Sequence, residues 1–118
     1  MSRRDLSGAL DLSVLKGFTL DDADLADEVL SLFQEQVRIW SPMLDSREPG
    51  WNDAVHTLKG SASGVGAMQV AEACAAAETA DKDTLPGKLE ALRDALDAAL
   101  ADVAAYRHEL AIRSLRGG

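Results

Sequence analysis

Apolar residues recur along this chain at the three- and four-residue spacing of α-helices, and this periodicity constrains the fold more than any other feature. The clearest example lies mid-chain, where one face comprises Trp51, Val55, Leu58, Ala62 and Val65. This pattern is typical of a helix with one buried side. No stretch alternates apolar and polar residues for long enough to predict a β-sheet. The sequence therefore predicts an all-α protein.

The same periodicity predicts three further long helices and one short helix or turn. The approximate ranges are 12–18 for the short element, then 22–44, 49–66, 67–81 and 84–113. Pro42 is expected to kink the first long helix or to end it near Trp40, and Pro49 is placed at the start of the next. The apolar face of the first long helix is expected to comprise Leu25, Val29, Leu32, Phe33, Val37, Trp40 and Leu44. That of the fourth is expected to comprise Leu89, Leu92, Leu96, Leu100, Val103 and Leu110.

Short connections between four long amphipathic segments favour an antiparallel, up-down-up-down four-helix bundle. The 118 residues suit a single domain spanning 1–118. Within it, residues 1–10 are expected to form a loose leader and residues 114–118 a frayed tail.

Composition excludes several classes of function. The net charge of −8 argues against nonspecific nucleic-acid binding, which needs a basic face. No apolar run approaches the length of a membrane span, and the N-terminus lacks the apolar stretch of a secretory signal. The single cysteine, Cys74, forms no internal disulfide and is interpreted as a small core residue. A cytoplasmic protein without a membrane partner is expected.

One residue of the central helix is available for chemistry. His56 falls beside the apolar stripe, on a flank that it shares with Lys59, Gly60 and Ser63. A glycine inside a helix costs roughly 0.5–1 kcal/mol relative to alanine. Gly60 therefore weakens a helix that must continue through it. We interpret this glycine as a clearance that lets another molecule reach the imidazole, with close helix packing as the alternative.

The run His56-Thr57-Leu58-Lys59-Gly60, followed by small residues and then Val65-Gly66-Ala67, resembles the histidine phosphotransfer (HPt) domain of bacterial phosphorelays. Downstream, the segments 70–74 and 77–78 fit the next helix of that family. The resemblance covers essentially the whole chain. It implies a phosphocarrier rather than a kinase, and the sequence has no nucleotide-cradling loop.

The resemblance also implies individual roles. His56 would be the phosphoacceptor, and Lys59 would neutralise part of the phosphoryl charge. Gly60, Ser63 and Gly64 would belong to the docking surface, although Gly64 equally suits a helix end. Glu78 would accept the second imidazole N–H and fix the tautomer, with an ordinary surface acid as the alternative.

The implied partners are a hybrid histidine kinase and the receiver domain of a response regulator, and the receiver domain would bring its aspartate and Mg²⁺. No cofactor and no metal are expected on this chain, which is expected to be a monomer. His108 is interpreted as a surface residue.

Two other functions remain open at this point. A noncatalytic docking module would bind receiver domains without being phosphorylated. The dimerisation fragment of an autokinase is less favoured, because an acidic residue and a proline usually follow its histidine, whereas Thr57 follows here and the next proline is Pro86. A zinc site lacks suitable ligand spacing.

Overall fold

The computed structural model describes residues 8–117, and every regular element in that range is a helix. The elements in chain order are α1 (Leu12–Thr19), α2 (Ala23–Trp40), the 3₁₀ helix η1 (Ser41–Met43), α3 (Trp51–Val65), α4 (Met68–Glu78) and α5 (Leu85–Gly117). The all-α prediction is confirmed for this range, and the short N-terminal element is the helix α1.

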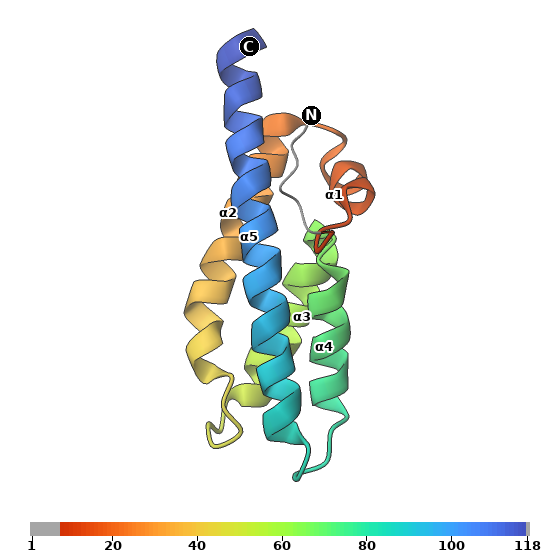
Figure 1. The fold of residues 1–118 in the computed structure, drawn as a ribbon, viewed down its shortest axis with the longest axis vertical. Helices are drawn as coiled ribbons and strands as arrows, with labels where there is room; N and C mark the ends of the chain where they lie inside the picture. The colour runs from red at the N-terminus through yellow and green to blue at the C-terminus, as the bar shows by residue number, and fades with distance from the viewer. Residues whose placement is uncertain (1–7, 118) are drawn as a thin grey trace.

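The four long helices lie side by side (Figure 1). Helices α2 and α4 run in one direction and α3 and α5 run in the other. Each packs against two of its neighbours, in the order α2, α3, α4, α5 and back to α2. Helix α1 packs against α2 and α3, and α5 extends beyond the other helices at its C-terminal end (Figure 1).

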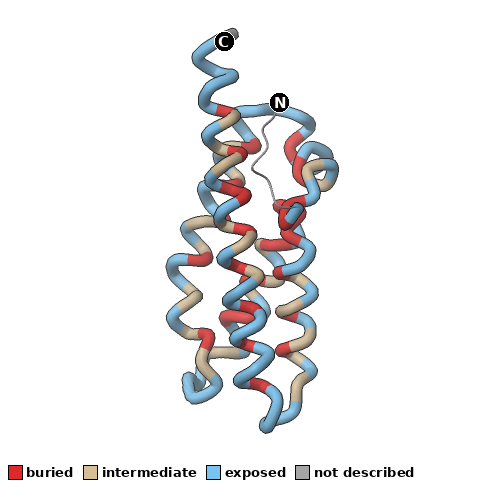
Figure 2. The backbone as a smooth tube through the Cα atoms, viewed as in Figure 1, coloured by how far each residue is buried: buried red, intermediate tan, exposed pale blue. Residues whose placement is uncertain are grey.

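The buried residues form one continuous core between these helices (Figure 2). The predicted inner face of α3 is buried, apart from Trp51, which is half-buried. Helix α4 buries Val70, Cys74 and Ala77. In α5, Leu100 is also only half-buried, while Ala99 and Tyr106 join the core. At about 25 cal/mol per Å² of apolar area removed from water, this core is the main source of stability.

The predicted inner face of α2 is partly wrong. The structure buries Ala26, Leu30, Phe33 and Val37, which follow one another at four, three and four residues. Leu25 and Leu32, placed inside by the sequence analysis, are exposed. Helix α2 therefore has two apolar sides, one with the buried residues and one with Leu25 and Leu32. Periodicity alone does not say which side faces the core.

Both proline predictions concern helix ends. Helix α2 ends at Trp40, which is one of the two effects predicted for Pro42. Pro42 itself lies in η1. Pro49 is not in α3, which begins at Trp51. The reason is a turn in which the Trp51 N–H donates to the carbonyl of Glu48 at 3.2 Å, and this turn holds Pro49 outside the helix.

A glycine after α3 fixes the position of α1. Gly66 adopts φ +81° and ends α3, and its carbonyl accepts a hydrogen bond from the Asp11 N–H at 2.8 Å. A Cβ on Gly66 would lie 2.4 Å from the Asp11 carbonyl oxygen. Only glycine satisfies both the left-handed backbone and this close approach. The N-cap of α1 is thereby held against the end of α3.

The two ends of the chain differ from expectation where they are described. Ala9 and Leu10, assigned to a loose leader, are buried, and the Ala9 N–H donates to Oδ2 of Asp102 at 2.9 Å. Residues 114–117 continue α5 as helix rather than forming a frayed tail, and the side chains of residues 114–116 are exposed. Residues 1–7 and 118 of those two predicted segments lie outside the described residues.

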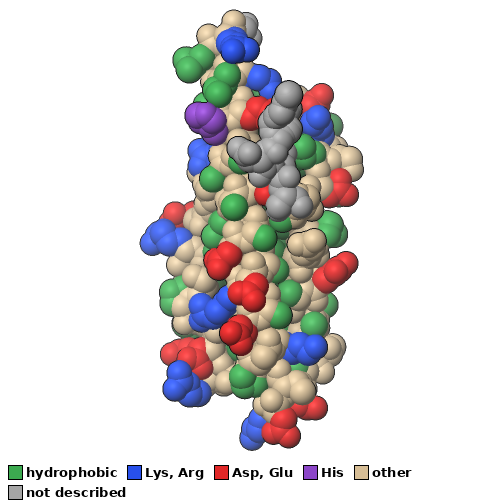
Figure 3. Space-filling view, in the orientation of Figure 1, with side chains coloured by type: hydrophobic (Ala, Val, Ile, Leu, Met, Phe, Trp, Pro, Cys, Tyr) green, Lys and Arg blue, Asp and Glu red, His purple; other side chains and the backbone are tan. Residues whose placement is uncertain are grey.

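Two surface properties bear on partners. On the face shown in Figure 3, acidic and basic side chains intermingle without a broad basic area. No helix between residues 8 and 117 has the length and apolar character needed to cross a membrane.

Candidate functional site

His56 projects from the outer side of α3. Its neighbour Val55 and Leu58, two residues on, are fully buried, whereas the imidazole is 76% exposed. The cause is the helical rotation of about 100° per residue, which turns position 56 away from the core. The predicted exposure of this histidine is therefore found in the structure.

Glu78, the last residue of α4, contacts two side chains of the α3 flank, those of His56 and Lys59. Its Oε2 lies 3.3 Å from Nδ1 of His56, and its Oε1 accepts a hydrogen bond from Nζ of Lys59 at 2.5 Å. The bond from Lys59, with a smaller contribution from His56, holds the pKa of the Glu78 carboxyl below its usual range. The carboxylate is therefore ionised at neutral pH, and it brings together three residues that the sequence placed on two helices.

The contact with Glu78 determines which imidazole nitrogen is available. An ionised carboxylate can only accept hydrogen bonds, so Nδ1 of His56 must carry the proton in this contact. In the neutral ring, the lone pair then lies on Nε2. The contact with Glu78 therefore holds Nδ1, and it leaves Nε2 on an imidazole that is exposed to solvent.

Lys59 is closely engaged with Glu78 in this structure. Its ammonium was predicted to neutralise a phosphoryl group on His56. In this structure the ammonium forms an ion pair with the carboxylate that His56 also contacts. Its side chain remains about one third exposed. Lys59 and the imidazole of His56 are thus linked through the carboxylate of Glu78.

The small residues of α3 leave open space next to His56. A Cβ placed on Gly60 or Gly64 would meet nothing within 4 Å, so neither glycine is required by helix packing. Gly64 does not end the helix, because α3 continues to Val65. Ser63 is exposed, and its hydroxyl donates to the carbonyl of Lys59 at 3.0 Å.

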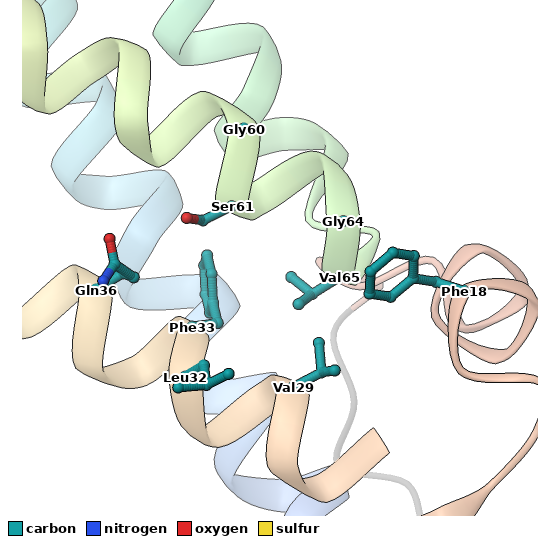
Figure 4. A pocket seen from close by; sticks show the side chains of 9 residues that line it. All are labelled: Phe18, Val29, Leu32, Phe33, Gln36, Gly60, Ser61, Gly64 and Val65. Atoms are coloured by element: carbon teal, nitrogen blue, oxygen red, sulfur yellow. The ribbon is translucent and has the colours of Figure 1, made fainter. Parts of the chain in front are cut away.

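A cavity of about 320 Å³ lies between α2 and α3, next to Gly60 (Figure 4). Helix α2 contributes Leu32 and Gln36 to its lining, and Phe18 reaches it from α1. The sequence did not predict this cavity. The available signal was the exposed apolar side of α2, of which Leu25 and Leu32 were assigned to the core.

Cys74 and His108 lie where the sequence predicted, in the core and on the surface respectively. Cys74 is fully buried, and its burial, with a smaller contribution from the Glu78 charge, raises the pKa of its thiol to about 12. It is therefore an unreactive core residue. His108 is exposed on α5. Among residues 8–117, His, Cys, Asp and Glu side chains form no group of three suited to hold a metal ion.

The chain matches a known protein family and a solved structure. The Hpt domain family model matches residues 24–102, which is more than half of the chain. The protein therefore belongs to the Hpt domain family, whose members carry phosphoryl groups between histidine kinases and receiver domains.

The chain is also similar to a protein of known structure, the histidine phosphotransferase ShpA from Caulobacter crescentus. The two share 52% sequence identity over 92% of this chain and 100% of that chain, with a TM-score of 0.80. A comparison with curated protein sequences found no match.

Proposed function

We propose that this protein relays a phosphoryl group through Nε2 of His56, from the receiver domain of a hybrid histidine kinase to the aspartate of a response regulator. The observation that carries the proposal is the pairing of an imidazole that is 76% exposed with a carboxylate at its inner nitrogen. Family membership supports phosphotransfer in general, and this geometry supports Nε2 of His56 as the accepting atom.

The chemistry consists of two displacements at phosphorus. The Nε2 lone pair attacks the aspartyl phosphate of the kinase receiver, a P–N bond forms, and the P–O bond breaks to release the aspartate carboxylate. The ring gains positive charge, which the ionised Glu78 beside Nδ1 stabilises. In the second step the regulator's aspartate attacks phosphorus, and the P–N bond electrons return to Nε2.

The other predicted residues assist these steps. Lys59 lies one helical turn from His56 and supplies positive charge close to the phosphoryl oxygens. Gly60, Ser63 and Gly64 form a low surface on which the partner approaches. The Mg²⁺ that stabilises phosphoryl transfer belongs to the receiver domain. The protein is thus a phosphocarrier without a nucleotide site of its own.

The test is transfer of radiolabelled phosphoryl from a phosphorylated receiver domain to the wild-type protein, to His56→Gln and to His108→Gln. His108 is a matched control, because it is also exposed but lies on α5 away from Glu78. We expect label on the wild type and on His108→Gln and none on His56→Gln.

Two outcomes count against the proposal. Equal labelling of His56→Gln and wild type would place the phosphoryl group elsewhere. Binding without labelling of any variant, with a receiver that phosphorylates another acceptor, would instead support a noncatalytic docking module.

A further inference from the structure

Residues 8–11 form a short strap that leads to the start of α1. The Ala9 N–H donates to Oδ2 of Asp102 on α5 at 2.9 Å, and the Asp11 N–H donates to the Gly66 carbonyl at 2.8 Å. The apolar side chains of the strap are buried. The strap is therefore fastened at two points that lie far apart in the sequence, one on α5 and one at the end of α3.

The fastening point on α5 is a buried carboxyl group. Asp102 is 1% exposed, and it is the only acidic or basic side chain that is buried within residues 8–117. Taking a carboxyl group out of water costs free energy unless hydrogen bonds replace those made to water. An apolar residue at this position would join the core without that cost. The bond to the Ala9 N–H gives Asp102 a role that an apolar residue could not perform, which is to hold the strap.

Helix α1 depends on such attachments for its position. Its eight residues are fewer than the roughly 12–15 that an isolated helix needs to be stable in water. Leu20 and Asp21, which link it to α2, adopt φ angles of 55° and 59°. Residues with a side chain keep such left-handed backbone angles only where the surrounding structure enforces them. The link to α2 therefore does not set the position of α1 by itself, and the strap supplies a second attachment.

The position of α1 affects the approach to His56. Phe18 reaches from α1 into the lining of the cavity beside Gly60 and is 63% exposed (Figure 4). Gly60 lies about one helical turn from His56. An interface of standard size covers about 800 Å² on each partner, so a receiver domain that reaches Nε2 extends over Gly60 and the adjoining part of α1. A displaced α1 would change the surface that the receiver meets.

We propose that Asp102 is a positioning residue for partner recognition. Through the Ala9 N–H it holds the strap, the strap holds α1, and α1 presents Phe18 beside the approach to His56. Asp102 itself lies on α5, which carries none of the candidate site residues. Its contribution is therefore to the binding of the receiver and not to the transfer of the phosphoryl group. This inference rests on the proposed function, because it takes the receiver domain as the partner.

The experiment measures transfer from one phosphorylated receiver domain at increasing concentrations of this protein. The probe is the receiver that labels the wild type fastest in a panel purified from the same organism. The half-saturating concentration reports binding, and the maximal rate reports the chemical step.

Four variants separate the strap from general stability. Asp102→Ala removes the acceptor of the Ala9 N–H, whereas Asp102→Asn keeps an oxygen acceptor. Leu10→Ala loosens the strap without changing α5, because Leu10 is one of the buried strap residues. Val103→Ala is the matched control, since Val103 is the fully buried neighbour of Asp102 on α5 and its truncation weakens the core.

We expect Asp102→Ala and Leu10→Ala to raise the half-saturating concentration about fivefold, as when α1 is correctly placed in about one fifth of the molecules. Their maximal rates should stay within about twofold of wild type, because His56 is unchanged. Asp102→Asn should resemble wild type in both quantities. Val103→Ala should lower the melting temperature and leave the half-saturating concentration unchanged. Labelling of His56 by phosphoramidate, a small donor that needs no docking, should be equal in all variants.

Hydrogen exchange of the α1 amides tests the strap directly, without a partner. Exchange should be faster in Asp102→Ala and Leu10→Ala than in Val103→Ala, because only the first two release α1. Circular dichroism checks that each variant is folded.

Unchanged α1 exchange, or an unchanged half-saturating concentration, in the strap variants that fold would overturn the inference and leave phosphotransfer through His56 intact. So would an equal rise of the half-saturating concentration in Val103→Ala. Failure of every receiver to label the wild type would overturn the proposed function, and this inference with it.

Discussion

Nζ of Lys59 lies 2.5 Å from Oε1 of Glu78, so an ion pair joins α3 to the last residue of α4 next to the exposed imidazole. The second oxygen of the same carboxylate faces Nδ1 of His56 at 3.3 Å. Glu78 therefore serves two donors at once. This arrangement fixes the tautomer of His56 and leaves its ring exposed to solvent.

Replacing Glu78 by Gln should slow phosphotransfer by about five- to tenfold. The amide keeps the shape of the side chain but loses the charge that stabilises the phosphorylated ring, and one charge-assisted hydrogen bond at an exposed site is worth about 1 kcal/mol. A time course of label transfer from a phosphorylated receiver, with samples quenched at intervals, measures the rate. Glu72→Gln, an exposed acid on the same helix, is the control and should transfer at the wild-type rate. Equal rates for all three proteins would mean that Glu78 is an ordinary surface acid.

Substitutions of Gly60 should separate the stability of the protein from the access of a partner to the imidazole of His56. Gly60→Ala should leave stability unchanged or raise it by up to about 1 kcal/mol, because the new Cβ meets nothing within 4 Å. Gly60→Gln should fold equally well and slow transfer, since its longer side chain stands one turn from the imidazole. Gly87→Gln, at another open helical glycine, is the control for a new side chain. Normal transfer by folded Gly60→Gln would contradict the role of this glycine as a clearance.

Gly66→Ala should destabilise the protein by about 1–3 kcal/mol. The substitution combines a left-handed backbone with a Cβ placed 2.4 Å from the Asp11 carbonyl oxygen. Thermal unfolding followed by circular dichroism measures the loss. Gly64→Ala, two residues earlier, has room for its Cβ and should be neutral or slightly stabilising. Similar melting temperatures for the two variants would show that the junction between α1 and α3 adapts.

The ion pair between α2 and α5 should make stability depend on pH. Arg107 donates to both carboxylate oxygens of Asp27 and thereby lowers the pKa of that carboxyl. A carboxyl whose pKa is lower in the folded state contributes stability above its unfolded pKa of about 3.9 and loses it as pH falls through the folded value. The contribution should be below about 1 kcal/mol, because both side chains are partly exposed to water.

Urea unfolding at neutral pH and near pH 3 measures this effect. Asp27→Asn should lose less stability than wild type between the two pH values, whereas Asp94→Asn, an exposed carboxylate on α5, should match wild type. An Asp27→Asn protein with the full wild-type dependence would place the acid sensitivity in other carboxyls.

Local sequence signals predicted most of the helices and the exposed histidine. The stripe of α3 was unambiguous, because its apolar positions all lie on one face, and it also determined where His56 points. Pro42 marked the end of α2 because proline blocks helix continuation. These features depend on residues close together in the chain.

The features that sequence reasoning missed depend on tertiary packing. Both stripes of α2 have helical periodicity, and only its packing against α3 and α5 selects Leu30 over Leu32 for the core. The cavity between α2 and α3 was not predicted for the same reason. The burial of Ala9 likewise depends on Asp102, which is distant in the sequence.

The most direct test of the account is to identify the phosphorylated atom. Protein labelled with ¹⁵N at its histidines is phosphorylated by its receiver partner, and nuclear magnetic resonance then detects the nitrogen that is bonded to phosphorus. We predict a single phosphorylated nitrogen, Nε2 of His56, which loses its phosphorus when a second receiver domain is added. Phosphorus on Nδ1 of His56, on His108 or on no histidine would contradict the account.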